Sequence, residues 1–168
     1  NMTHYGYTYF PSIGPAHELR LIDIVAELAR RDGVAPEQVV WKPHPVFYQR
    51  DPAVRELVSA RLAGEGFTLW PDEIMPFDLS ASYETVIVTP SGVALDLLKA
   101  GRLPVMAEFQ PIDPEHVLAH IEPRGHDRDS LAHAIATARD PGLAEALFEQ
   151  VWQRTGPGAI GSIEDIER

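Results

Sequence analysis

The feature that most constrains this chain is the regular alternation of short β-rich runs with amphipathic helical patterns. The run TVIVT at residues 85–89 is almost wholly β-branched, which is typical of a strand buried on both faces. Further strands are predicted at residues 5–10, 39–42, 67–70 and 103–106, and helices at residues 16–31, 52–63, 93–100, 129–139 and 141–154. Such alternation with short connections predicts an α/β fold, a parallel sheet with helices on both faces.

The right-handed crossover rule leaves few ways to order these strands. We expect a doubly wound, Rossmann-like sheet of five to six strands in the order 3-2-1-4-5, and residues 3–155 as one nucleotide-binding domain. Asn1 precedes Met2, which is typical of a vector-derived residue before a start, so residues 1–2 are set aside. Residues 156–168 are Gly-rich and then acidic, and we expect a poorly ordered or accessory tail there.

Composition excludes several classes of protein. The chain has 14 Lys+Arg against 25 Asp+Glu, a formal net charge of −11, which argues against a nucleic-acid partner. It has no cysteine and therefore no disulfide framework, zinc finger or cysteine nucleophile. No run of about 18 apolar residues and no signal peptide is present. We therefore expect no transmembrane segment and a cytoplasmic location, with peripheral attachment to the inner membrane through the rest of the protein as an open alternative.

Three loops of the expected fold meet at the carboxyl edge of the sheet, where strand order reverses and ligands bind. Ser12 and Ser91 each stand in a strand–Pro-Ser–helix pattern, in which backbone N–H groups suit a phosphate. His44 lies between two prolines, a rigid mount for an imidazole near the same place. Together these residues predict a site for a small anion. Each also has an ordinary interpretation, because serines cap helices without any ligand and loop histidines are usually surface residues.

Other motifs are missing from the chain. No G-x-G-x-x-G follows the first strand, no G-x-x-x-x-G-K-[ST] is present, and Ser91 lacks the glycines of a G-x-S-x-G nucleophile elbow. His116 and His120 are spaced i, i+4, but no third ligand is evident, so no metal site is predicted.

Two segments carry a resemblance to a known family. Residues 41–45, WKPHP, and residues 85–105, TVIVTPSGVALDLLKAGRLPV, resemble the nucleotide-binding C-terminal half of GT-B glycosyltransferases. The group concerned is the capsule, teichoic-acid and polysialic-acid enzymes, including CDP-glycerol glycerophosphotransferases. These enzymes share a K-x-H-P loop and a later S-x-x-x-x-E-A-x-x-x-G-x-P-V helix-turn, and the similarity covers roughly residues 5–154.

The resemblance implies a function and a set of site residues. The chain would be the donor-binding half of a bacterial, inverting, metal-independent glycosyl- or glycerophosphotransferase of surface polysaccharide synthesis. It would use no cofactor and would bind a CMP-, CDP- or UDP-linked sugar or polyol. His44 would steady the leaving group as the catalytic residue, and Ser12, Ser91 and the Gly92 amide would hold the donor phosphate. Lys42 and Asp96 are candidates for contacting the base or the ribose of the donor. Asp96 stands where the family commonly has a glutamate.

Two alternatives stay open from the sequence. One is a non-catalytic module that binds a nucleotide or a protein, and the other is the corresponding half of a UDP-sugar epimerase. Because the N-terminal acceptor half of a GT-B enzyme is absent from these residues, we expect the isolated chain to be inactive even if the transferase interpretation is right.

Overall fold

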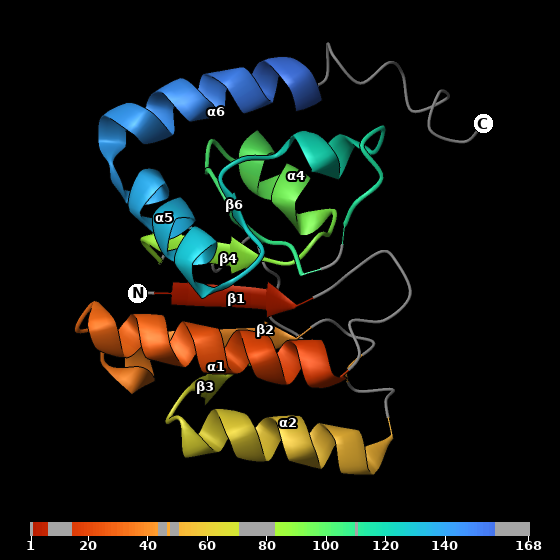
Figure 1. Ribbon diagram of the computed structural model, residues 1–168, viewed down its shortest axis with the longest axis vertical. Coiled ribbons are helices and arrows are strands. Elements are labelled where there is room, and N and C mark those ends of the chain that lie inside the picture. Colours follow the sequence, from red (N-terminus) through yellow and green to blue (C-terminus); the bar gives the residue numbers. More distant parts are fainter. Residues whose placement is uncertain are drawn as a thin grey trace.

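The computed structural model describes the backbone of residues 2–6 and, with their side chains, residues 15–43, 47, 51–70, 83–109 and 111–156. The elements run along the chain (Figure 1) as β1 (Met2–Gly6), α1 (Pro15–Arg31), η1 (Pro36–Gln38), β2 (Val39–Pro43), α2 (Pro52–Gly64), β3 (Thr68–Leu69), β4 (Thr85–Val88), α4 (Val93–Lys99), β5 (Val105–Ala107), η3 (Val117–His120), β6 (Arg124–Gly125), α5 (Arg128–Arg139) and α6 (Pro141–Thr155).

Every strand pairing in the described part of the chain is parallel. β2 pairs with β3 to form one group, and β4, β5 and β6 form a second group. The backbone of β1 lies between the two groups and pairs with both β2 and β4, so the strand order is β3-β2-β1-β4-β5-β6. The α/β class and the parallel strands expected from the sequence are therefore confirmed.

Helices pack on both faces of these strands, as the alternation of side chains along β4 requires. Ile87 of β4 belongs to a core cluster with residues of α1, α2 and α5, and Trp41 of β2 lies in the same cluster. Val86 and Val88 point the other way, into a second cluster with residues of α4, η3 and α6. Residues 85–88 are all buried, which explains the continuous β-branched run in the sequence.

The first strand begins earlier than predicted. β1 spans Met2–Gly6, so it begins three residues before the expected 5–10. It pairs with β2 as far as Gly6 and with β4 as far as Tyr5. Residues 7–10 of the predicted strand lie outside the described residues.

β6 was not predicted, because two residues, Arg124 and Gly125, give no periodicity. None of the described helices has the length and apolar character needed to cross a membrane.

Candidate functional site

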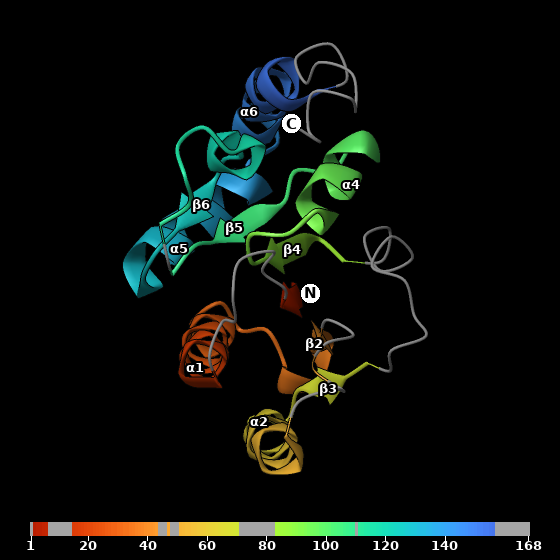
Figure 2. The same ribbon diagram turned by 90° about the vertical axis from the view of Figure 1, so that its right-hand side faces the viewer.

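The candidate site lies at the carboxyl edge of the strands, which faces the viewer in Figure 2. The chain proceeds from β1 to β2 and β3 on one side, and β4 to β6 lie on the other, so strand order reverses between β1 and β4. Tyr5 is the residue of β1 that pairs with both Lys42 of β2 and Val88 of β4. The register therefore puts the ends of these three strands at one level, as the sequence analysis expected for a ligand site.

Lys42 is buried at this edge, with only 1% of the residue exposed. Val39 and Trp41 of the same strand pack in the cluster beside α1, so alternation directs Lys42 to the opposite face. Val88, at the same level two strands away, points to that face as well, where α4 packs. The backbones of Lys42 and Val88 are thus two strand spacings, roughly 10 Å, apart. The Nζ atom of Lys42 donates to the carbonyl oxygen of Pro43 at 3.5 Å.

The turn after β4 holds further hydrogen-bond donors at the same edge of the sheet. Ser91 is 2% exposed, and its Oγ accepts a hydrogen bond from the Val93 N–H at 3.2 Å. Its carbonyl accepts from the Ala94 N–H at 3.0 Å, which begins α4. Within the described residues, the N–H groups of Ser91 and Gly92 have no partner. Because α4 has only 7 residues, its macrodipole is weak. Any attraction of this turn for an anion therefore comes mainly from the two N–H groups.

Gly92 leaves open space beside these donors. It is exposed, its φ is −55°, and a Cβ placed on it would meet no atom within 4 Å. The backbone conformation therefore does not require glycine at this position. What the missing side chain provides is access for another molecule to the backbone N–H groups of the turn.

The remaining predicted residues are placed as follows. Asp96 lies one turn into α4 with its side chain 62% exposed, and it pairs with Lys99 at 3.4 Å. His44 and Ser12 lie outside the described residues, so their roles stay predictions. The structure thus places Lys42 and the turn that holds Ser91 and Gly92 at the same edge of the sheet, and the exposed Asp96 lies one turn further along α4.

Two residues that the sequence analysis did not consider lie in the first turn of α1, after the loop that follows β1. Glu18 is 6% exposed, although it is ionisable. His17 has a buried Nδ1 atom without a hydrogen-bond partner. A carboxylate in the first turn of a helix is favoured by the helix dipole. The only sequence signal that could have pointed to His17 and Glu18 is their position directly after a loop predicted to bind a ligand.

No group of three or more His, Asp or Glu side chains that could hold a metal ion occurs in the part of the chain that the structure describes. His116 uses its Nδ1 to accept a hydrogen bond from the Leu118 N–H at 3.2 Å, which caps η3. Comparisons with protein-family models, with curated proteins and with solved structures found no match. The resemblance to GT-B glycosyltransferases therefore stays an expectation from the sequence.

Proposed function

We propose that this chain is the donor-nucleotide-binding half of a GT-B glycosyl- or glycerophosphotransferase, built on a doubly wound parallel sheet. The observation that carries the proposal is the presence of a buried lysine and of two backbone N–H groups without a described partner at one edge of the sheet, where strand order reverses. A doubly wound fold alone would not support it, since such folds host many functions.

The chemistry of transfer explains why these groups suit the reaction. Glycosyl transfer breaks the bond between the donor carbon and the phosphate oxygen, and glycerophosphate transfer breaks the phosphoanhydride bond of the donor. In both reactions negative charge builds up on the departing nucleotide. Fixed N–H donors and a cation held away from water stabilise that charge better than water does, because they need no reorganisation. Lys42 would supply the cation, and Ser91 and Gly92 the N–H groups. His44 would steady the same phosphate, and His44→Ala in the complete enzyme should cost about 2–4 kcal/mol of transition-state stabilisation, measured from kcat/KM.

Thermal melts of the chain with CMP, CDP, UMP, UDP, GDP and ADP test the binding part of the proposal. A ligand at about ten times its Kd stabilises the folded state by roughly 1.4 kcal/mol. For a chain of this size that raises Tm by about 3–6 °C. We expect a shift with cytidine or uridine nucleotides and none with the corresponding nucleoside, because the phosphate supplies the charge that the site holds.

Gly92→Val is the variant that locates the site. Its side chain enters the open space over the turn, so it should abolish the nucleotide shift and change the Tm of the free chain little. Gly64→Val is the matched control, since a Cβ at Gly64 also meets nothing within 4 Å and Gly64 ends α2, away from the carboxyl edge. Absence of any nucleotide shift, or equal losses in both variants, would overturn the proposal and favour a non-catalytic interaction module.

A further inference from the structure

One arginine at the carboxyl edge of the sheet is held by an aromatic ring instead of a carboxylate. Arg20 lies in the second turn of α1, and its guanidinium carbon is 5.3 Å from the centre of the Phe109 ring. Within the described part of the chain, the Arg20 side chain has no ion pair or hydrogen bond. A cation–π contact holds the guanidinium in place and leaves its N–H donors available to another molecule.

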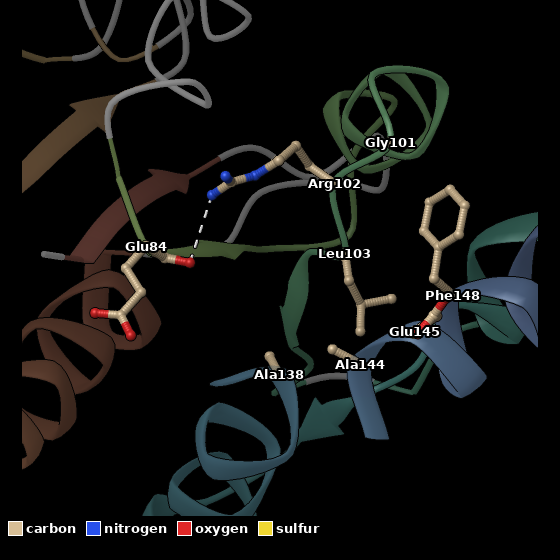
Figure 3. Close-up of a pocket in the computed structure, with 8 residues that line it drawn as sticks. All are labelled: Glu84, Gly101, Arg102, Leu103, Ala138, Ala144, Glu145 and Phe148. Atoms are coloured by element: carbon tan, nitrogen blue, oxygen red, sulfur yellow. Dashed lines mark hydrogen bonds between the residues drawn. The ribbon is translucent and has the colours of Figure 1, made fainter. Parts of the chain in front are cut away.

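Other arginines of the chain are engaged with the protein itself. The chain has 25 acidic against 14 basic residues, so a cation readily finds a carboxylate. Arg102 donates to the backbone carbonyl of Glu84 at 3.4 Å (Figure 3). Arg55 and Arg154 have no carboxylate partner either, but among the described residues no aromatic ring holds them. Most of the described arginines form ion pairs, namely Arg30, Arg31, Arg61, Arg124, Arg128 and Arg139.

The contact with Phe109 places the Arg20 guanidinium beyond the end of β5. β4 and β5 are neighbouring strands, and Val88 of β4 pairs with Met106 of β5. Ser91 follows Val88 by three positions, and Phe109 follows Met106 by three positions. Phe109 thus lies past the carboxyl end of β5, as the turn with the Ser91 and Gly92 N–H groups lies past that of β4. Neighbouring strands are about 4.8 Å apart.

Cationic side chains therefore come from both sides of the turn after β4. Lys42 lies two strands away on β2, and Arg20 reaches over the end of β5, the next strand on the other side (Figure 2). His17 lies three residues before Arg20 on α1, and its buried Nδ1 has no hydrogen-bond partner. Buried polar atoms without a partner are uncommon in folded proteins. This part of α1 thus carries polar groups that the protein itself leaves unsatisfied.

We propose that Arg20 binds the second phosphate of a nucleoside diphosphate, beside the phosphate held at the turn of Ser91 and Gly92. The inference rests on the proposed function and narrows its donor class to diphosphate-linked donors. A second phosphate adds negative charge and oxygens that the planar guanidinium can bind two at a time. Phe109 is a positioning residue, because its ring keeps the guanidinium at the edge and away from carboxylates.

Calorimetric titrations of the chain with CMP, CDP, UMP and UDP test the inference, with EDTA present so that no divalent cation neutralises the phosphates. For the base that binds, we expect the diphosphate to bind about three- to tenfold more tightly than the monophosphate. This range lies between an exposed ion pair and a charge-assisted hydrogen bond. Arg20→Gln should bring the ratio of the two affinities close to one and leave the monophosphate Kd unchanged. Phe109→Leu should lower the ratio in part.

Arg30→Gln is the matched control. It removes the same charge from the same helix about 15 Å further along, in the last turn of α1, and it should leave the ratio unchanged. A ratio near one in the parent chain would overturn the assignment of Arg20, and so would equal losses for mono- and diphosphate in Arg20→Gln, while nucleotide binding itself stands. No binding of any of the four nucleotides would overturn the proposed function, and the assignment of Arg20 with it.

Discussion

The contact between β6 and α5 predicts that Gly125→Ala strongly destabilises the chain. A Cβ on Gly125 would lie 2.4 Å from both the Cα and the N of Leu131 and 2.8 Å from the carbonyl carbon of Ser130. All three are backbone atoms, so no side-chain rotation relieves the contact. Ordinary van der Waals separation requires roughly 1 Å more, and the first turn of α5 must move away from the strand to give it.

The size of the effect follows from what must move. Leu131 is 0% exposed and belongs to the core cluster shared with α1 and β5, so a shift of its backbone disturbs that core. Overpacking a core commonly costs about 1–3 kcal/mol, and a backbone clash places this site near 3 kcal/mol or above. At roughly 2–4 °C per kcal/mol for a chain of this size, Tm should fall by about 6–12 °C.

The assay is urea unfolding and thermal melting followed by circular dichroism, with Gly92→Ala as the matched control. A Cβ on Gly92 meets nothing within 4 Å, so that variant should stay within about 0.5 kcal/mol of the parent chain. Similar free energies of unfolding for the two variants would refute the reasoning, because the substitutions are chemically identical and differ only in the space that receives the methyl group.

Three further predictions concern ionisable groups. Arg124→Lys should destabilise by about 2–4 kcal/mol in urea unfolding, because Arg124 contacts Glu108 at 2.5 Å and two backbone carbonyls, which an ammonium cannot all reach; a neutral result would contradict this. Hydrogen bonds from the Ser130 side chain and backbone lower the pKa of Asp127. The stability that the Asp127 carboxylate gives is therefore present above the ordinary carboxyl pKa and is lost as pH falls. Asp127→Ala should lower Tm at pH 7, and the Tm difference between the variant and the parent chain should disappear in acid. Burial raises the pKa of Tyr83 above its ordinary value of 10.0. The absorbance difference between the parent chain and Tyr83→Phe should therefore change at a higher pH than a free phenol does. The stability that the neutral Tyr83 side chain gives should be lost as pH rises through the raised pKa.

Most of the fold could be predicted from the sequence because its elements carry strong local signals. α1 was expected at residues 16–31 and spans Pro15–Arg31, since one apolar face and the glycine at position 33 fix its length. α2 begins at Pro52 after the Asp51 cap, whose side chain accepts from the Ala53 N–H at 2.8 Å. Short edge elements such as β6 exist only because a neighbouring strand offers partners, and no local pattern reveals them.

The candidate site was predictable only in part. The loop after β4 was recognisable from its Pro-Ser-Gly sequence. In the structure, the N–H groups of Ser91 and Gly92 in this loop have no hydrogen-bond partner among the described residues. The burial of Lys42 was not predictable, because it depends on which face of the sheet the Lys42 side chain occupies and on what packs against that face. Asp96 was selected by its position in a motif, whereas the helix period directs it to an exposed pair with Lys99.

A chain with a net charge of −11 can hold a small anion only if local donors outweigh the distant carboxylates. At physiological ionic strength charges are screened over roughly 8 Å, so exposed acidic groups elsewhere on the surface contribute little at the carboxyl edge. Lys42 is removed from water, so its attraction for a phosphate at this edge is screened far less than that of an exposed lysine. A long polyanion, in contrast, would have to lie along the acidic surface itself. The charge distribution therefore favours a mononucleotide over a nucleic acid, and nucleotide binding should weaken only modestly between low and physiological salt.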